Sequence, residues 1–361
     1  AKRIGDLTGH EAKTLHRLLE VQWSDEDVPA FGRNETNPLD TDVLVIDEMS
    51  MVDTQLFEHT LRALKADCRL ILVGDTDQLP AVGAGCVLQD LIESGILPVV
   101  QLTEVFRQAM ESHIIRNAHR IVRGELPELG FREGDFFFLQ KTSVQSVSET
   151  LLDLCARRLP NRYDVSVWDG LQVLCPGRKG PLGTRELNRG LQELLNPPGP
   201  DKPEITIEGT LLRKGDKVMH TRNNYDIGWT KEDGEFGSGI FNGDIGILEE
   251  VDRNGEALSV RYDDRVALYT KQEAQDLELA YAVTVHKSQG SEFEAVVMPL
   301  FQHAPQLSYR NLLYTAVTRA KSLLVLVGSP GVLRDMVEND RKTLRYTGLG
   351  SFIERAAEQL L

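Results

Sequence analysis

Short runs of apolar residues that end in acidic or glycine-containing segments recur along the N-terminal part of the chain. Residues 42–48 (DVLVIDE) and 69–75 (RLILVGD) are two such runs, and each ends at an acidic residue. Continuous apolar runs of this length are typical of strands that are buried on both faces of a parallel sheet. Residues 56–65 and 103–123 show helical spacing of their apolar positions. This part of the chain therefore predicts strands that alternate with helices.

The C-terminal part shows the same alternation, but a segment of different character interrupts it. Residues 173–175 and 323–327 are strand-like apolar runs, and residues 185–195 have helical spacing. From 211 to 272, short segments of alternating polarity are separated by turns, among them Asn254-Gly255. Asn-Gly between alternating segments is a strong hairpin signal. This segment predicts a small antiparallel β-barrel.

Together these patterns predict an α/β protein of two parallel-sheet lobes, with the barrel inserted into the second lobe. The expected boundaries are residues 1–140 for the first lobe, 141–210 and 276–361 for the second lobe, and 211–275 for the barrel. The functional loops of parallel sheets lie at the carboxyl ends of the strands. The acidic and glycine-containing segments at those ends are therefore the first candidates for chemistry.

The composition limits the classes of function without choosing one. The 361 residues include 40 Lys and Arg and 55 Asp and Glu, which gives a formal net charge of −15. This charge argues against a uniformly basic surface that coats polyanions, but it leaves room for nucleic acid in a locally basic cleft. The four cysteines form no CxxC pair, so neither a zinc knuckle nor a disulfide scaffold is expected, and a reducing, cytoplasmic compartment is the default. No apolar run approaches the ~20 residues of a membrane helix, so no membrane partner is expected.

Two acidic residues, Asp47 and Glu48, follow the first apolar run directly. In a nucleotide-hydrolysing site the first would hold Mg²⁺, directly or through water, and the second would polarise the attacking water. The alternative is a strand that simply ends in solvated acids. Gln78, in the segment after the next strand, could hydrogen-bond a terminal phosphate, although the same segment also fits a Gly/Asp/Pro turn.

Two arginines and one polar loop add to these candidates. Arg107 and Arg319 each lie in an apolar helical context, and arginine suits the charge that develops on a transferring phosphoryl group. A solvated surface charge is the alternative for both. Residues 284–293 (TVHKSQGSEF) combine hydrogen-bonding groups, a cation and a glycine after the apolar run 279–283. Such a loop can contact phosphates on one side and ribose or polynucleotide on the other.

Seven short segments are spaced along the chain, and the resemblance that their order and spacing carry covers nearly the whole chain. In this order the sequence resembles the superfamily 1 DNA helicases, and specifically their RecD-like branch, the exodeoxyribonuclease V alpha-subunit family. The segments are VIDEMSMVD (45–53), LVGDTDQLPAVGAG (72–85), LTEVFRQ (102–108), VLCPGRKGPLG (173–183), FNGDIG (241–246), YAVTVHKSQGSEF (281–293) and NLLYTAVTRAK (311–321).

The resemblance implies two RecA-like lobes, an SH3-like barrel, and an ATP-dependent helicase that moves 5′→3′ on single-stranded DNA with ATP and Mg²⁺, in DNA repair or recombination. It implies that Asp47 is the Mg²⁺ ligand, Glu48 activates water, Gln78 senses the γ-phosphate, and Arg107 and Arg319 are arginine fingers. The implied nucleotide contacts are Gly290, Glu292 and Lys287. The implied DNA contacts are Thr14, His16, Arg17, Asn223, Tyr225, Thr284 and His286. Residues 21–38 occupy the place of a strand-separating pin, whose aromatic residues would be Trp23 and Phe31, although packing is an equally good interpretation for both.

One expected segment is missing from this sequence. Helicases of this kind need a phosphate-binding loop of the form GxxxxGK[ST], and no such segment occurs in the chain. In the family this loop lies upstream of the position that corresponds to Ala1. The resemblance therefore implies an ATP-dependent helicase for the parent protein, and a chain that does not bind or hydrolyse ATP productively by itself.

Other functions stay open at this point. The chain could be a non-catalytic DNA-binding or partner-binding subunit of a nuclease–helicase complex, since the RecD-like branch includes such a subunit. No nuclease constellation is evident, so no nuclease activity is assigned. An unrelated phosphate-loop ATPase is disfavoured, because residues 281–293 and 311–321 would have no role there.

Overall fold

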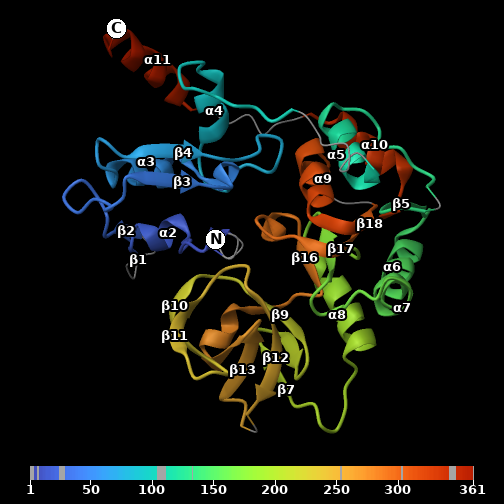
Figure 1. Cartoon of the computed structure of the whole chain (residues 1–361). Coiled ribbons are helices and arrows are strands. Elements are labelled where there is room, and N and C mark those ends of the chain that lie inside the picture. The colour runs from blue at the N-terminus through green and yellow to red at the C-terminus, as the bar shows by residue number, and fades with distance from the viewer. Residues whose placement is uncertain are drawn as a thin grey trace. The chain divides into compact units, whose positions relative to one another are not determined.

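The computed structural model describes residues 4–5, 8–23, 29–103, 111–131, 133–252, 254–301, 304–340 and 347–360 (Figure 1). Contacts between residues divide the chain into two compact units. The first contains residues 1–104 and 342–361, and the second contains residues 105–341.

The first unit is built on two short parallel strands, β3 (Val43–Ile46) and β4 (Arg69–Leu72). One face of this pair packs on a core that includes Met49, Phe57 and Val87. The helices that contribute to this core are α3 (Thr54–Arg62), α4 (Val87–Glu93) and, through two partly buried residues, α11 (Leu349–Leu360). Side chains alternate between the faces of a strand, so the residues between the core positions point to the opposite face.

The opposite face of this sheet is apolar and exposed. Val43, Val45, Ile71 and Val73 are 45%, 56%, 43% and 47% exposed. Parallel sheets are normally covered on both faces, and a pair of strands is rarely stable without such cover. The sequence predicted two buried strands here, and the structure shows that only one of their faces is covered.

A helix and a hairpin precede this sheet in the sequence. Helix α2 (Leu15–Leu18) leads into β1 (Val21–Trp23), which pairs antiparallel with β2 (Pro29–Phe31). The Phe31 ring stacks on His59 of α3 with a centroid distance of 3.9 Å. Phe31 therefore packs within the first unit, while the side chain of Trp23 lies outside the described part of the chain.

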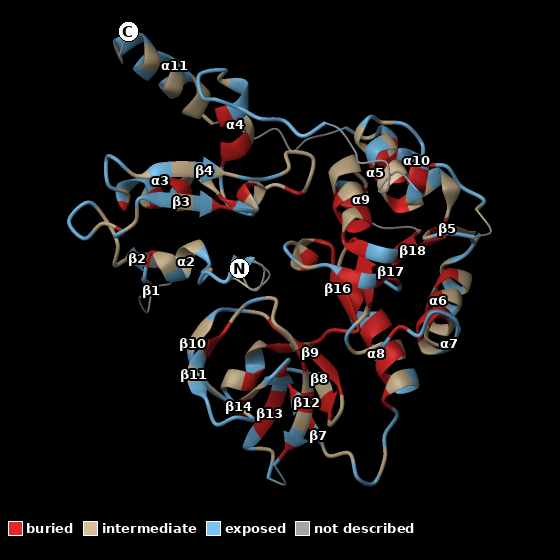
Figure 2. Cartoon of the chain, in the orientation of Figure 1, coloured by how far each residue is buried: buried red, intermediate tan, exposed pale blue. Residues whose placement is uncertain are grey.

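The second unit contains a five-stranded parallel sheet in the order β16-β6-β17-β18-β5. These strands are β5 (Phe136–Gln140), β6 (Leu171–Cys175), β16 (Ala282–Thr284), β17 (Phe293–Leu300) and β18 (Ala320–Gly328). The helices of this unit are α5 (His113–Val122), α6 (Val144–Asp153), α7 (Leu159–Tyr163), α8 (Thr184–Leu195), α9 (Arg310–Thr318) and α10 (Pro330–Glu338). Every residue of β6 and β16 is buried, as are most of β17 and β18 (Figure 2), which explains the continuous apolar runs in the sequence.

The barrel is an antiparallel seven-stranded sheet in the order β11-β10-β14-β13-β12-β9-β15. Its strands are β9 (Lys217–His220), β10 (Asn224–Lys231), β11 (Phe236–Ile240), β12 (Ile245–Val251), β13 (Ala257–Tyr262), β14 (Arg265–Thr270) and β15 (Leu277–Leu279). A separate hairpin, β7 (Glu204–Ile207) with β8 (Thr210–Arg213), precedes it. The barrel and the parallel sheet share one hydrophobic core.

The compact units differ from the expected boundaries at two places. The first lobe was expected to extend to residue 140, but β5 pairs with β18 and therefore belongs to the sheet of the second unit. Residues 349–360 were expected in the second lobe, but α11 packs on α4 in the first unit. Apolar periodicity locates a strand or a helix, but it does not say which sheet or helix it joins. Within the described residues, no helix has both the length and the apolar composition to cross a membrane.

Candidate functional site

The acidic pair lies where β3 ends. β3 and β4 are in parallel register, with Ile46 opposite Leu72, and Val73 N donates to Ile46 O at 2.8 Å. The chain then turns so that Met49 N donates to Val73 O at 2.9 Å. Asp47 stands in this turn with an exposed side chain whose Oδ1 accepts from Glu48 N at 2.8 Å. The parallel register thus brings the segments that follow β3 and β4 to one edge of the sheet.

Glu48 has an unusual backbone conformation. Its φ and ψ are 54° and 42°, in the left-handed region that glutamate seldom adopts. It precedes the short 3₁₀ helix Met49–Met51, where Met49 is fully buried and Met51 N donates to Glu48 O at 2.9 Å. Such strained residues are concentrated at functional sites, because only a firm surrounding structure maintains them.

Gln78 lies in the turn that follows β4. Its Nε2 donates to Asp75 Oδ2 at 3.4 Å, and Asp77 N donates to Asp75 Oδ1 at 2.9 Å. Gly74 lies close to the acidic turn, since a Cβ added there would be 3.0 Å from Met49 N. The structure therefore places Asp47, Glu48 and Gln78 in two turns that contact each other.

Three of the predicted DNA contacts, Thr14, His16 and Arg17, also lie in the first unit. Thr14 is the N-cap of α2, and its Oγ1 accepts from Arg17 N at 3.4 Å. Burial lowers the pKa of His16, and the nearby carboxylate of Asp53 opposes this shift. Asp53 in turn caps α3 through Leu56 N at 2.8 Å. A neutral His16 and an exposed Arg17 side by side can contact a base and a phosphate, respectively.

The polar loop of the second unit connects β16 to β17. Thr284 is 9% exposed, and its Oγ1 accepts from Lys287 N at 3.3 Å at the start of a 3₁₀ turn, His286–Ser288. His286 is half-buried, and burial lowers its pKa. Gly290 has a φ of +74° with open space around it, so a backbone N–H of this loop can approach a ligand closely.

Arg319 is held against this loop. It follows α9 and is 4% exposed, and its Nη1 donates to Ser291 O at 3.1 Å. Phe293 N donates back to Arg319 O at 2.8 Å, and Lys321 pairs with Glu292 at 3.9 Å. The structure thus brings together Gly290 and Glu292, two of the predicted nucleotide contacts, and Arg319, one of the two predicted arginine fingers.

The remaining predicted contact residues of the second unit lie in the polar loop and in the barrel. Lys287 Nζ forms an ion pair with Glu278 of β15 at 3.3 Å. In the barrel, Asn223 Oδ1 accepts from Asn242 N at 3.0 Å, and the Tyr225 ring meets Phe241 edge-on at 5.6 Å. Residues 221–225, which join β9 to the start of β10, therefore lie on the turn of the FNGDIG segment.

The predicted site residues are divided between the two units. Arg107 lies outside the described residues. The structure also contains a buried polar network around Asp216 and Tyr281, which was not predicted from the sequence. The only signal that could have pointed to it is the pair of charged residues Asp216 and Lys217 at the start of a buried strand.

Comparisons with known proteins agree with this architecture. A family model described as "AAA domain" matches residues 1–135. One described as "ATP-dependent RecD-like DNA helicase SH3 domain" matches residues 187–262, and one described as "UvrD-like helicase C-terminal domain" matches residues 279–327.

Two relatives show the similarity along most of the chain. The ATP-dependent RecD2 DNA helicase of Deinococcus radiodurans is 38% identical over 91% of this chain and 41% of its own length. The RecBCD enzyme subunit RecD of Mycolicibacterium smegmatis is 30% identical over 95% of this chain and 59% of its own length. The chain thus spans about half the length of these relatives.

Two solved structures share the fold. The Pif1 helicase from Bacteroides in complex with ADP-AlF3 and ssDNA is 18% identical, with a TM-score of 0.50 over 96% of this chain and 83% of that one. Bacteroides Pif1 bound to ssDNA gives the same TM-score at 16% identity, over 99% of this chain and 90% of that one.

The fold is that of a superfamily 1 helicase motor, with parallel RecA-like sheets and an SH3-like barrel. Within this class, the SH3 domain and the two relatives assign the branch: the chain belongs to the RecD-like helicase family.

Proposed function

We propose that this chain is the motor part of an ATP-dependent helicase that binds single-stranded DNA and moves along it. The observation that carries the proposal is the acidic turn of the first unit. There Glu48 is held in a left-handed conformation between Asp47 and the turn that contains Gln78. Ligands of parallel sheets bind at the carboxyl ends of the strands, and strained residues are concentrated at functional sites, so a carboxylate in this position suits nucleotide hydrolysis. RecD-like membership supports the same reaction.

In this proposal each residue of the site has one task. Asp47 would hold Mg²⁺ through a carboxylate oxygen, which is the type of ligand that Mg²⁺ prefers, and bound Mg²⁺ would neutralise phosphate charge. Glu48 orients the attacking water and accepts its proton. Gln78 donates a hydrogen bond to the terminal phosphate. Arg107 and Arg319 stabilise the charge that develops on the transferred group.

The proposed DNA contacts fall into polar and aromatic groups. Thr284 and His286 belong to the polar loop, and Asn223 and Tyr225 belong to the barrel. Tyr225 offers a ring on which a base can stack, and stacking tolerates any sequence. Contacts to phosphates make affinity fall with salt, so we expect affinity for a homopolymer oligonucleotide to decrease steeply as salt concentration rises.

The direction of movement along the DNA is a further part of the proposal, and it rests on the family resemblance. We propose 5′→3′ translocation in DNA repair or recombination. Duplexes with a 5′ or a 3′ single-stranded overhang test it directly. Unwinding that depends on the 5′ overhang is the expected result, and unwinding that depends on the 3′ overhang would contradict the polarity.

The substitution Glu48→Gln tests the enzyme proposal. It should be made in a protein that carries a GxxxxGK[ST] segment ahead of residue 1, since that loop binds the β- and γ-phosphates. The variant should lose DNA-stimulated ATP turnover by about a hundredfold or more, while nucleotide binding is retained. Glu93→Gln, at an exposed position at the end of α4, is the matched control and should keep turnover. Near-normal turnover in Glu48→Gln would refute the assignment.

A second function is favoured by one specific relative, which is named as the RecD subunit of the RecBCD enzyme. The chain could serve as a DNA-binding or partner-binding subunit of a nuclease–helicase complex without hydrolysing ATP itself. The same ATPase measurement separates the two proposals. DNA binding without DNA-stimulated turnover, in a protein that has the phosphate-binding loop, would favour the subunit role.

A further inference from the structure

The barrel and the parallel sheet of the second unit are joined by a very short crossover. Strand β15 ends the barrel sheet at Leu279, and β16 begins the edge of the parallel sheet at Ala282. Only Ala280 and Tyr281 lie between them. These four residues, Leu279 to Ala282, are called the crossover below, and all are at most 9% exposed.

Two buried amide side chains hold the crossover backbone. Asn188 of α8 donates from Nδ2 to Leu279 O and Ala282 O, both at 2.9 Å, and its Oδ1 accepts from Ala282 N at 2.7 Å. Gln172 of β6 donates from Nε2 to Ala280 O at 3.0 Å and to Tyr281 O at 3.1 Å. The crossover is thus hydrogen-bonded to both a helix and a strand of the motor sheet.

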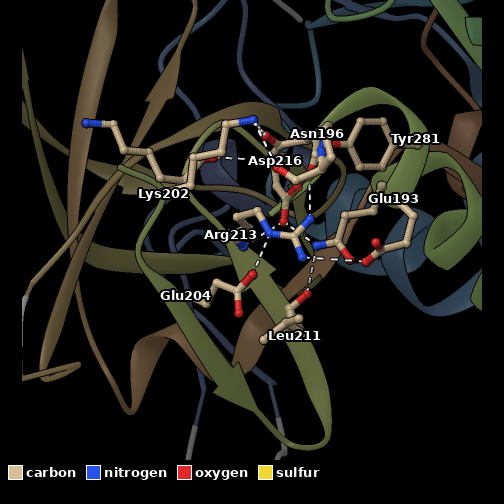
Figure 3. A network of polar contacts seen from close by, with 11 residues as sticks. Glu193, Asn196, Lys202, Glu204, Leu211, Arg213, Asp216 and Tyr281 are labelled. Carbon is tan, nitrogen blue, oxygen red and sulfur yellow. Dashed lines mark hydrogen bonds and ion pairs between the residues drawn. The ribbon is translucent and has the colours of Figure 1, made fainter. Parts of the chain in front are cut away.

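The side chain of Tyr281 makes the connection to the barrel. Its hydroxyl donates to Asp216 Oδ1 at 2.9 Å, and Asp216 is fully buried directly before strand β9 (Figure 3). Asp216 also accepts from Gln192 and Asn196 of the α8 region, at 2.6 and 2.7 Å, and from Arg213 N at 2.6 Å. Four donors therefore converge on one buried carboxylate.

The surroundings of Asp216 are equally fixed. The Arg213 guanidinium is 2% exposed and pairs with Glu204 at 2.6 Å and Glu193 at 3.5 Å, and it also donates to Asn196 O. Lys202 Nζ donates to Asn196 Oδ1 at 2.6 Å (Figure 3). Buried networks of this kind rigidify their surroundings, because breaking one bond leaves an unpaired polar group in a low-dielectric interior.

The two strands that this hydrogen bond connects lead to the two proposed DNA-contact groups of the unit. β9 starts after Asp216 and is followed by residues 221–225, the barrel loop, which contains Asn223 and ends within the first residues of β10 at Tyr225. β16 starts after Tyr281 and ends at Thr284, directly before the turn with His286. Next to the crossover, Glu278 of β15 pairs with Lys287 in that same turn.

We infer that Asp216 and Tyr281, with Asn188 and Gln172, are positioning residues that fix the barrel loop relative to the polar loop of the motor sheet. Together with the shared hydrophobic core, the four side chains make the barrel and the parallel sheet one mechanical body, so that both loops hold DNA in a single fixed register. This inference rests on the proposed function, because it concerns how the two groups of DNA contacts act together. None of the four residues touches DNA in it.

The substitution Tyr281→Phe tests the inference, and Tyr262→Phe is its matched control. Both tyrosines are at most 3% exposed, and the Tyr262 hydroxyl bonds only to Tyr269 inside the barrel, at 2.7 Å, among the hydrogen bonds of the described residues. Each variant keeps its ring and loses one buried hydroxyl, so both should fold with similar losses of thermal stability. Two quantities are measured in the 361-residue chain: the affinity for a fluorescent oligo-dT by anisotropy, and amide hydrogen exchange.

Tyr281→Phe should raise the dissociation constant for oligo-dT about threefold to tenfold, the scale of the net contribution of one typical hydrogen bond. It should also speed amide exchange in both β9 and β16. Tyr262→Phe should leave the affinity unchanged and speed exchange only around β13 and β14. Equal affinities of the two variants, or unchanged exchange in β16 of Tyr281→Phe, would overturn the positioning role. A wild-type chain that does not bind oligo-dT at all would instead overturn the proposed function, and this inference with it.

Discussion

At the scale of single residues, the backbone of Glu48 is the feature that connects stability with function. A left-handed conformation costs a residue with a Cβ roughly 1 kcal/mol, whereas asparagine tolerates it well. We therefore predict that Glu48→Asn increases the free energy of unfolding of the first unit by about 0.5–1 kcal/mol, while it removes the carboxylate that we assign to water activation. Denaturant unfolding followed by hydrogen exchange within β3 and β4 measures this gain unit by unit.

Glu208 provides the matched comparison for this prediction. It has a φ of 46° in the turn between β7 and β8, far along the chain from the acidic pair, and Gly209 follows it. Glu208→Asn creates the Asn-Gly turn that hairpins favour, so it should stabilise the second unit by a similar amount without affecting ATP turnover. If Glu48→Asn lowers stability while Glu208→Asn raises it, the conformation of Glu48 is not strained in the way proposed.

The identity of the candidate residues could be predicted from the sequence, but their local geometry could not. Asp47, Glu48 and Gln78 were found because acids and amides follow apolar strands, and the parallel register does place their turns in contact. The left-handed turn at Glu48 has no sequence signal, since it depends on Met49 N reaching Val73 O on the next strand. The burial of Arg319 against Ser291 O was not foreseen either, because it results from contacts between distant segments.

At the scale of elements, strand β9 contains a buried charge whose energetics can be measured. Lys217 is 1% exposed, and its Nζ donates to Leu171 O at 3.0 Å and Val167 O at 3.3 Å. Burial lowers the pKa of Lys217 to about 8, and the nearby carboxylate of Asp169 opposes this shift. The Lys217 ammonium therefore connects strand β9 to one carbonyl at the start of β6 and to one that precedes it. Burying this charge costs desolvation free energy.

This cost predicts a pH dependence of stability. Between about pH 8 and the ordinary lysine pKa of about 10.4, the unfolded chain binds a proton that the folded chain has released. The free energy of unfolding contributed by Lys217 should therefore rise with pH across this window and be constant below it. Lys217→Met removes the titrating group, so the difference in stability between wild type and variant should increase in favour of the wild type from pH 8 to 10. Parallel stability curves for the two proteins across that range would contradict the prediction.

The elements themselves were mostly predicted well, with one informative exception. Residues 279–283 read as a single apolar run before the polar loop, yet Leu279 ends a barrel strand and Ala282 starts a strand of the motor sheet. Both strands are buried, so their apolar patterns merge in the sequence. Only the pairing partners distinguish them, β9 for the first and β6 for the second, and these pairings are long-range.

At the scale of the whole molecule, the sequence predicted two parallel-sheet parts and an inserted barrel, and the family comparisons confirm that class. It did not predict that α11 packs on α4, because an amphipathic helix shows which of its faces is buried but not where. Nor did it predict the exposed apolar face of β3 and β4. The exposed apolar face of β3 and β4 leads to a prediction about the segment that covers it in a longer protein.

The family resemblance implies a segment that contains a strand, the phosphate-binding loop and a helix, at a position N-terminal to residue 1. The two relatives are longer than this chain. We expect this segment to cover the face formed by Val43, Val45, Ile71 and Val73. Val45→Lys should then change the stability of the 361-residue chain by no more than about 0.5 kcal/mol, because Val45 is 56% exposed there. In a protein that carries the segment, the same substitution would bury an unpaired ammonium and should cost about 2 kcal/mol or more.

The control for this comparison is Leu268→Lys on β14, where the side chain is 69% exposed in the barrel. It should be tolerated equally in the short and the longer protein, so it corrects for any general effect of an added charge. Chemical denaturation of Val45→Lys and Leu268→Lys, each made in the 361-residue chain and in the longer protein, gives the free energy of unfolding of all four variants. The effect of each substitution is then compared between the two proteins. An equal, small effect of Val45→Lys in both proteins would show that the phosphate-binding segment does not pack on this face. A large effect confined to the longer protein would place that segment next to Asp47 and Glu48, because β3 carries Val45 on its apolar face and the acidic turn at its end.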